Sequence, residues 1–451
     1  MRKLILGVLG LVSFVALTAQ ERRLNIDIDM VDGFRSDAKS VFDTRFLEKD
    51  MLTLTLNSDL VSQYDTICTY RVNTAGITDQ MKSGRCWYFS TLNILRAEVI
   101  KKYGLENFEF SQTFGQFWDV LEKSNRFLEN VIENRKKPID SRMNEWLFKK
   151  PIGDGGNFAN AAHITAKYGI VPLEVMPEKY SSTDNFRLMT VVRTILRRYG
   201  LMLREADGKD LQGIKEAALS DVYKVLSSNL GEPPTEFVWT MRDKDGRVIS
   251  EKKYTPQSFR DEFVAHDMEN DYVIFMDDPT KPYYRRYTVP NSRNCYEYSD
   301  WTFLNVPAEE LSAMGLESLK NGSMFYFSAD TDASALMMEG IYDTRLFDLE
   351  GKLGISISMN KEEMVRSCEI KSLHAMAMAG VELDEEGRPV KWLIENSFGT
   401  VRGWDGYVVM QHEWLMTYLF RMAVERRFVP ENLLPLLDKK PKALKSWNPT
   451  Y

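Results

Sequence analysis

A cysteine at the start of a helical pattern is the residue in this chain best suited to covalent chemistry. Cys86 follows Gln80 by six residues, stands two residues after Gly84, and opens an apolar helical pattern at Trp87. A thiol attacks carbonyl carbon as the thiolate, so its ordinary pKa of about 8.5 has to fall for reaction near neutral pH. A helix N-terminus and an adjacent imidazolium both favour the thiolate. We therefore interpret Cys86 as a catalytic nucleophile, although a cysteine that heads an apolar helix is more often part of a core.

A histidine and an asparagine far downstream complete the chemistry that this thiol needs. Among four histidines, His374 opens a buried strand pattern, and Asn396 ends the next strand pattern after a turn at 384–387. On paired antiparallel strands the amide oxygen can accept from one ring nitrogen and direct the other at sulfur. Gln80 can donate a side-chain N–H to the oxyanion, alongside the backbone N–H of Cys86. The set predicts a cysteine hydrolase, although a structural histidine or a plain Asn-Ser turn would explain single members of it.

Helical patterns precede strand patterns along the chain. Apolar residues at three- and four-residue spacing predict helices at 86–104, 114–134, 157–168 and 196–223. Asp245-Gly246 between extended residues indicates a hairpin turn. Strand patterns follow at 272–275, 284–289, 323–328, 374–381, 390–396 and 406–410. This order is typical of an α+β protein in two lobes, with its site in the cleft between them.

The same patterns predict how the chain is divided. We expect a signal peptide (1–19), an N-terminal extension (20–70), a helical lobe with the nucleophile (71–184), an inserted helical subdomain (185–270), a β-rich lobe with His374 and Asn396 (271–430) and a C-terminal arm (431–451).

The N-terminus indicates export. Arg2 and Lys3 precede an apolar run at 4–17, and a small-residue cleavage site follows at Ala19. No later window reaches the ~18 uninterrupted apolar residues that a membrane helix needs. We expect a soluble periplasmic or secreted protein with no membrane span after cleavage.

The composition bears on possible partners, disulfides and metal sites. The chain has 451 residues, 44% of them hydrophobic and 27% charged, and its formal net charge of −7 argues against nucleic acid as a partner. Its four cysteines are too few for a disulfide framework and show no metal-ligand spacing, so we expect mostly buried free thiols, no cofactor and no metal.

These residues resemble the papain-like cysteine peptidases, and specifically the bleomycin hydrolase (aminopeptidase C) branch. The run at 80–89 is similar to that branch's Q-K-x-S-G-R-C-W. Further matching runs lie at 108–112, 154–156, 168–172, 231–244, 255–259, 374–376 and 395–399. The resemblance covers the chain from about residue 65 to its end. Positions 86 and 374 are 288 residues apart, against ~130–150 in papain-like chains without an insertion, and the extra length matches the expected inserted subdomain.

The resemblance implies a two-lobed papain-like α+β fold with a helical insertion. It implies peptide substrates, with Cys86 as nucleophile, His374 as general acid and base, Asn396 as the residue that orients His374, and Gln80 as oxyanion donor. The branch typically assembles as a homo-oligomer, a hexamer whose insertions hook neighbouring subunits together.

By the same resemblance, Gly155 and Gly156 would lie along the cleft wall, where a residue without Cβ lets the backbone bind an extended substrate. A plain turn before the helix at 157–168 is the alternative for this pair.

The chain departs from the branch at three points. Phe398 stands where members generally carry tryptophan, and the export signal contrasts with a largely cytosolic branch. In the branch the C-terminal arm enters the cleft and its carboxylate limits substrates to those with a free N-terminus, but here the arm ends early, at Tyr451. An aminopeptidase is therefore our main prediction, and an endopeptidase with an open cleft is the first alternative. A peptide-binding protein on a peptidase scaffold is the second, although intact catalytic residues argue against it.

Overall fold

The computed structural model describes residues 26, 28–41 and 43–447. The predicted signal peptide at 1–19 and the terminal Tyr451 lie outside the described residues. Contacts divide the chain into two units: residues up to 56 together with 347–357, and residues 57–346 together with those from 358 onward. All predicted site residues belong to the second, larger unit.

The smaller unit is built from short helices. They are α1 (Ile28–Val41), η1 (Thr44–Leu47), α2 (Met51–Thr55) and α13 (Leu349–Leu353). Its two segments meet where the Asp348 backbone N–H donates to the Thr55 carbonyl at 2.9 Å.

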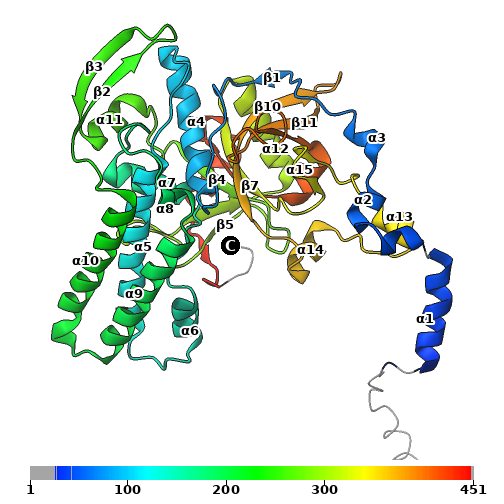
Figure 1. Ribbon diagram of the computed structural model, residues 1–451, viewed down its shortest axis with the longest axis horizontal. Helices are drawn as coiled ribbons and strands as arrows, with labels where there is room; N and C mark the ends of the chain where they lie inside the picture. The colour runs from blue at the N-terminus through cyan, green and yellow to red at the C-terminus, as the bar shows by residue number, and fades with distance from the viewer. Residues whose placement is uncertain (1–25, 27, 42, 448–451) are drawn as a thin grey trace, which may run out of the picture. The chain divides into compact units, whose positions relative to one another are not determined.

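Helices dominate the first half of the larger unit (Figure 1). They are α3 (Ser58–Val61), α4 (Cys86–Tyr103), α5 (Gln112–Asn134), α6 (Arg142–Lys149), α7 (Phe158–Tyr168), α8 (Tyr180–Thr183), α9 (Phe186–Glu205), η2 (Gly208–Asp210), α10 (Leu211–Leu230) and α11 (Pro256–Phe263). Later come α12 (Ala308–Lys320), α14 (Lys361–Ser367), α15 (His412–Tyr418), η3 (Arg426–Phe428) and η4 (Leu434–Leu436). The four helices predicted from the sequence all exist, but the predicted helix at 196–223 is two helices separated by η2.

The helix α4, which starts at Cys86, is buried on nearly all sides, which is typical of a helix that passes through a core. It ends at Gly104, which adopts a left-handed conformation (φ 65°) and donates its N–H to the Ile100 carbonyl. The helices α5, α9 and α10 lie side by side (Figure 1) and enclose a separate apolar core.

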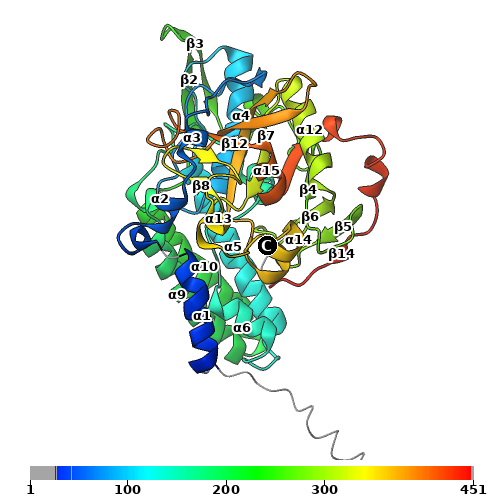
Figure 2. The ribbon, with the colours of Figure 1, turned by 90° about the vertical axis from the view of Figure 1, so that its right-hand side faces the viewer.

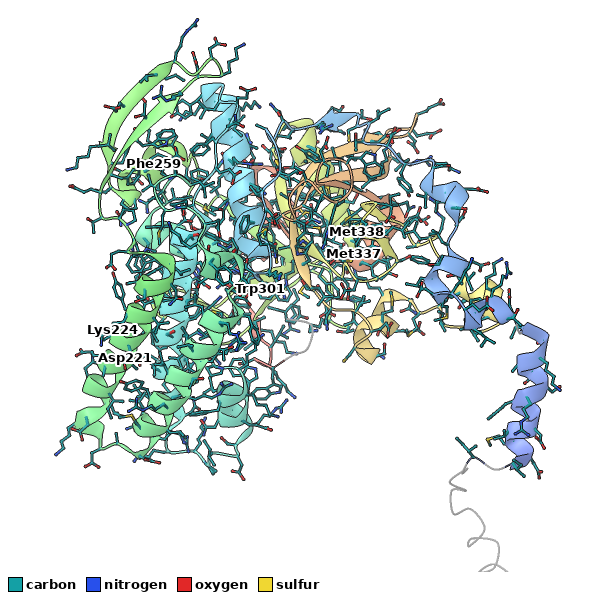
Figure 3. The ribbon with its side chains drawn as sticks, in the orientation of Figure 1. Asp221, Lys224, Phe259, Trp301, Met337 and Met338 are labelled. Atoms are coloured by element: carbon teal, nitrogen blue, oxygen red, sulfur yellow. The ribbon has the colours of Figure 1, made fainter. Side chains whose placement is uncertain are left out.

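The hairpin of β2 (Phe237–Arg242) and β3 (Val248–Tyr254) covers the helix α11. Phe259 of α11 lies beneath the hairpin (Figure 3) and packs edge-to-face against Trp239 and Tyr254, with ring centroids 5.2 Å apart in both pairs. The predicted turn closes the hairpin, because the Asp243 N–H donates to the Arg247 carbonyl.

Strands of the second half form one mixed sheet in the order β14-β5-β6-β4-β13-β7-β10-β11-β12-β9-β8, and β1, from the first half of the chain, pairs with β10. Its strands are β1 (Tyr70–Arg71), β4 (Tyr272–Met276), β5 (Arg285–Thr288), β6 (Thr302–Asn305), β7 (Phe325–Ala329), β8 (Ala335–Leu336), β9 (Ile341–Tyr342), β10 (His374–Leu383), β11 (Pro389–Glu395), β12 (Tyr407–Gln411), β13 (Leu419–Glu425) and β14 (Lys442–Ala443). The six predicted strands are all present, within a few residues of the expected bounds.

The sheet buries both of its faces. In β7, Tyr326 belongs to the core beneath α4, whereas Phe325 and Phe327 belong to the core beneath α12. This alternation follows from the two-residue period of a strand. Figures 1 and 2 both place α4 and α12 on opposite sides of β7.

The sequence prediction missed β13, although that strand lies between β4 and β7 in the middle of the sheet. All seven of its residues are buried, so the polar and apolar alternation that marks a half-exposed strand is absent. The predicted α+β fold, with a helical lobe and a sheet lobe, is confirmed.

Two further expectations can be compared with the described residues. No helix in the described part of the chain is both long and apolar enough to cross a membrane. All four cysteines are free, but only Cys295 is buried; Cys68 and Cys86 are half-buried and Cys368 is exposed, so the expectation of mostly buried thiols is wrong.

Candidate active site

Cys86 is the first residue of α4 and lies on the wall of a cavity of about 620 Å³. The loop that leads to it is held by charged groups. Arg85 is buried and donates from both terminal nitrogens to the Glu178 carboxylate, at 2.9 and 2.8 Å. Gly84 donates its N–H to Asp154 Oδ2 at 2.7 Å, and a Cβ at this glycine would stand 2.7 Å from that carboxylate. These hydrogen bonds therefore hold the backbone of residues 84–86 in place at the start of α4.

His374 opens β10, and its Nε2 lies 2.8 Å from Asn396 Oδ1. That oxygen also accepts the Ser397 backbone N–H at 2.8 Å, which identifies it as an acceptor. Nε2 must then carry the ring proton, and Nδ1 is left as the basic nitrogen. The ring of Phe398 stacks on the imidazole at 7° with centroids 4.8 Å apart, so the smaller aromatic ring covers one face of the His374 ring.

Cys86 and His374 line the same cavity. Burial raises the pKa of the thiol, and the backbone N–H groups of Ala375, the neighbour of His374, and of Trp87 lower it. Both side chains therefore face one cavity, at the place where α4 contacts β10.

The charge state of this pair is set by burial. Burial is the largest influence on both groups: it raises the pKa of the Cys86 thiol to about 11 and lowers the pKa of His374 to about 4. Near neutral pH each group taken alone is uncharged, so the helix N-terminus does not by itself produce a thiolate. Transfer of the thiol proton to His374 would create two opposite charges in the same cavity, and their attraction would offset part of the desolvation that each would suffer alone.

Gln80 lies in the same cavity, with its side chain held from both ends. Its Nε2 donates to the Ser83 carbonyl at 2.6 Å, and its Oε1 accepts from Ser397 Oγ at 2.6 Å. The second N–H of the amide remains for a developing oxyanion. Sequence reasoning assigned no role to Ser397; its place directly after Asn396 was the available signal.

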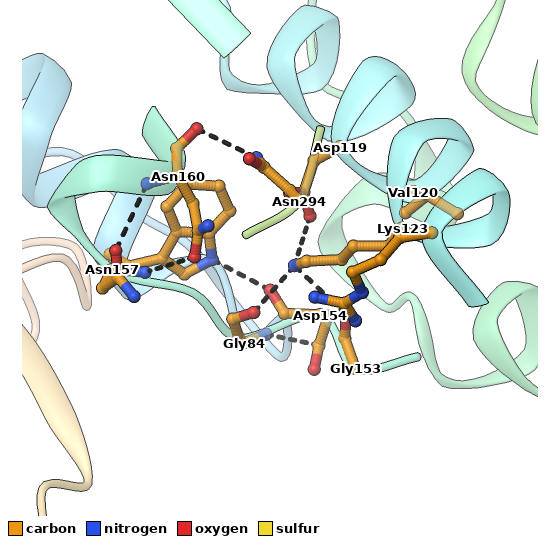
Figure 4. A network of polar contacts seen from close by, with 12 residues as sticks. Gly84, Asp119, Val120, Lys123, Gly153, Asp154, Asn157, Asn160 and Asn294 are labelled. Carbon is orange, nitrogen blue, oxygen red and sulfur yellow. Dashed lines mark hydrogen bonds and ion pairs between the residues drawn. The ribbon is translucent and has the colours of Figure 1, made fainter. Parts of the chain in front are cut away.

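Gly155 and Gly156 both line the cavity, but only at Gly156 does the surrounding packing require a glycine. A Cβ at Gly156 would stand 2.7 Å from the indole ring of Trp87, whereas nothing lies within 4 Å of a Cβ at Gly155. The Gly155 carbonyl accepts from Lys123 Nζ at 2.8 Å (Figure 4). The wall is therefore held by a buried lysine.

Lys123 belongs to the middle of α5, where nothing in the sequence distinguished it from a surface lysine. In the structure it is buried, pairs with Asp119 at 2.5 Å and donates to the Gly153 and Gly155 carbonyls (Figure 4). Only the tertiary structure shows that it supports the cleft.

Basic side chains outnumber carboxylates in the described wall of the cavity. Lys123, Arg126, Lys150 and Arg421 line it, whereas Asp154 is the one carboxylate among the described lining residues. Asp154 already accepts the Gly84 N–H and the Asn185 Nδ2–H, at 2.7 and 3.0 Å. The described wall therefore offers little to bind a positively charged group.

A helical lobe that presents a cysteine at a helix start, facing a sheet lobe that presents a His–Asn pair, defines a papain-like cysteine peptidase. Residues 26–450 match the model of the Peptidase C1-like family, and the chain belongs to this family.

Similar proteins agree over nearly the full length. The chain is 33% identical to aminopeptidase C of Listeria monocytogenes, over 91% of this chain and 94% of the relative. It is 32% identical to bleomycin hydrolase of Gallus gallus, over 89% of this chain and 91% of the relative. The crystal structure of PepW from Lactobacillus rhamnosis superposes with a TM-score of 0.91 at 30% identity, covering 94% of this chain and 98% of that one. The prediction of a cysteine peptidase of this branch is confirmed.

Proposed function

We propose that this cysteine peptidase is an exported aminopeptidase, which releases residues from the free N-terminus of peptides. The names of its relatives support the exopeptidase activity. The basic n-region, the apolar run and the small-residue site that precede residue 20 support export. By resemblance to the branch, we also propose a hexamer, which a solution mass measurement would test.

In the proposed reaction, Cys86 Sγ attacks the carbonyl carbon of the scissile bond while its proton passes to Nδ1 of His374. The carbonyl oxygen becomes an oxyanion, which accepts from the Gln80 amide and the Cys86 backbone N–H. The C–N bond then breaks as His374 gives the proton to the leaving amine, and an acyl-enzyme remains on sulfur. Water, deprotonated by His374, attacks this thioester; the C–S bond breaks, the acid product leaves, and His374 returns the proton to sulfur to regenerate the thiol.

The course of the C-terminal segment is the observation that carries the aminopeptidase proposal. The strand β14 pairs in parallel with β5, and Leu444 donates its N–H to the Thr288 carbonyl at 2.9 Å. Ser446 accepts from Asn291 Nδ2 at 3.1 Å and lines the same cavity as Cys86. The arm therefore reaches the cleft at Ser446.

Five residues follow Ser446 in the sequence, and such a segment can extend at most about 17 Å. Because Ser446 itself lines the cavity, we propose that the carboxylate of Tyr451 acts there. The carboxylate would supply the negative charge that the described wall lacks, and a substrate's protonated α-amine would pair with it. A long peptide that continued past the arm would be excluded.

Removal of residues 447–451 tests the proposal. The full-length enzyme should cleave aminoacyl reporters with a free amine and leave the same sequences untouched when they are N-acetylated. The truncated enzyme should cleave the acetylated peptides. If the full-length enzyme already cleaved them at a comparable rate, it would be an endopeptidase with an open cleft.

Cys86→Ala should abolish both activities, because the acyl-enzyme cannot form. Cys368→Gly is the matched control: this exposed cysteine has φ 63°, which glycine adopts without strain. Turnover by Cys86→Ala would rule out covalent catalysis at this residue and would revive the peptide-binding alternative.

A further inference from the structure

Outside the cavity, a second group of ligand-type side chains meets where the two lobes join. It consists of Glu98 on α4, His266 after α11 and Glu425 at the end of β13. One ligand atom from each lies within 4.8 Å of the other two, and His266 Nε2 is 3.1 Å from Glu98 Oε1. In the described part of the chain this is the one such group of three, and none of its members lines the cavity of Cys86.

His266 and Glu425 each have a further charged partner of the kind that orients metal ligands in proteins. The other ring nitrogen of His266, Nδ1, faces Asp271 Oδ2 at 3.7 Å. Glu425 accepts from Arg427, at 2.7 Å to Oε2 and 3.0 Å to Oε1. Asp271 therefore orients the His266 ring, and Arg427 orients the Glu425 carboxylate. Each Glu425 oxygen keeps a second lone pair with which it could bind an ion.

A buried tyrosine hydroxyl next to this group lacks a hydrogen-bond partner. Tyr272 is only 6% exposed, and its Oη has no hydrogen-bond partner among the described residues. Its ring packs edge-on against His266, with centroids 5.5 Å apart. Burial is the main cause that raises the pKa of this hydroxyl, and Glu98 and Glu425 are the charged groups that raise it most. A water on a metal ion at the group would give Oη a partner, because zinc with three protein ligands keeps a fourth position for water.

The local charge also favours a dication. Glu98, Glu425 and Asp271 contribute three carboxylates around His266, and Arg427 is a permanent cation that pairs with Glu425. With a neutral His266 two negative charges remain. Glu98 and Asp271 are 30% and 51% exposed at their side chains, so an ion can reach the group from solvent.

We propose that Glu98, His266 and Glu425 bind a divalent transition-metal ion, zinc by its ligand chemistry, which ties the nucleophile helix α4 to the central strand β13. One imidazole nitrogen and two carboxylate oxygens form a set that zinc accepts, and a Nε2–Oε1 separation of 3.1 Å suits two ligands about 2.0–2.2 Å from one ion. The site is structural and does not depend on the aminopeptidase proposal. Its rival is a metal-free ion pair, in which a protonated His266 bonds directly to Glu98.

Calorimetric titration with Zn²⁺ distinguishes the two. The Cys86→Ala protein is used as the parent, because the active-site thiol and imidazole would themselves bind zinc. We expect one equivalent bound, and a rise in the thermal midpoint. His266→Gln and Glu98→Gln in this background should each weaken binding at least about tenfold and remove the thermal shift. Mg²⁺, which prefers all-oxygen sites, should not compete.

His412→Gln is the matched control, since His412 is also half-buried but hydrogen-bonds Trp392 in the sheet lobe. It should bind zinc as the parent does. Asp271→Asn, at an exposed side chain, serves as a further variant that should fold and bind more weakly. Absence of zinc binding by the parent, or equal affinity in the parent and these cluster variants, would overturn the proposal in favour of the ion pair.

Discussion

A buried ion pair couples the two catalytic elements, and breaking it should be costly. Arg96 on α4 and Glu395, the residue before Asn396, are 2% and 0% exposed at their side chains, and Arg96 Nη2 lies 2.5 Å from Glu395 Oε1. Charges about 4 Å apart attract by about 4 kcal/mol at the effective dielectric of a protein. Arg96→Leu leaves the Glu395 carboxylate buried without its cation, so it should lower the free energy of unfolding by about 3–5 kcal/mol. Glu395→Leu should cost less, because Arg96 keeps the Gly76 carbonyl at 2.7 Å and Glu109 Oε1 at 3.8 Å.

The double variant should lose much less than the sum of the two single variants, because neither charge then remains. The assay is urea unfolding of the wild type, both single variants and the double variant, from which the coupling energy follows. Arg388 and Asp384 provide the matched pair, at 71% and 23% exposure in the β10–β11 turn, where coupling should stay below about 1 kcal/mol. A coupling below that value for Arg96 and Glu395 would refute the reasoning.

The pH dependence of this coupling has a definite sign. Burial raises the pKa of Glu395 to about 7, from an ordinary value near 4.3 in an unfolded chain. A carboxyl whose pKa rises on folding favours the folded state most below its unfolded pKa, and this contribution is lost as pH rises towards about 7. Glu395 is therefore largely protonated at pH 5.5, and its coupling to Arg96 should be weaker there than at pH 8. Equal coupling at both pH values would contradict the raised pKa.

Three further predictions concern catalysis. Ser397→Ala removes the hydrogen bond that fixes Gln80, so kcat should fall about tenfold with KM little changed, and an unchanged kcat would remove Ser397 from the oxyanion site. Phe398→Ala should lower kcat because it exposes one face of the His374 ring to water, whereas Phe398→Trp should keep most activity; equal loss in both would contradict a covering role. The acid limb of kcat/KM should lie near pH 4, since burial lowers the pKa of His374 to about 4, and a limb near 6.5 would show an imidazole that is not desolvated.

Much of the fold was predictable because local patterns agree with it. The predicted α4 starts at Cys86 and stops at Gly104, as its apolar spacing and terminal glycine require. The strand β13 was not predictable in this way, because it is buried on both faces and carries no alternation. Its place between β4 and β7 comes from long-range pairing, which a local pattern does not encode.

The sequence by itself determined the chemistry of this protein. The types and the order of Gln80, Cys86, His374 and Asn396 define a cysteine peptidase, because that reaction needs an oxyanion donor, a nucleophile, a base and an orienting amide. These demands concern the identity of side chains, and identity is visible in a sequence.

Only the tertiary structure decided the pKa values of the site residues and the approach of the C-terminal segment to the cavity. Burial sets the pKa values of Cys86 and His374, and burial depends on what the rest of the chain packs around them. The approach of Ser446 to the cavity likewise depends on the pairing of β14 with β5. Desolvation and reach are properties of the packed molecule, so no spacing of residues along the chain could have supplied them.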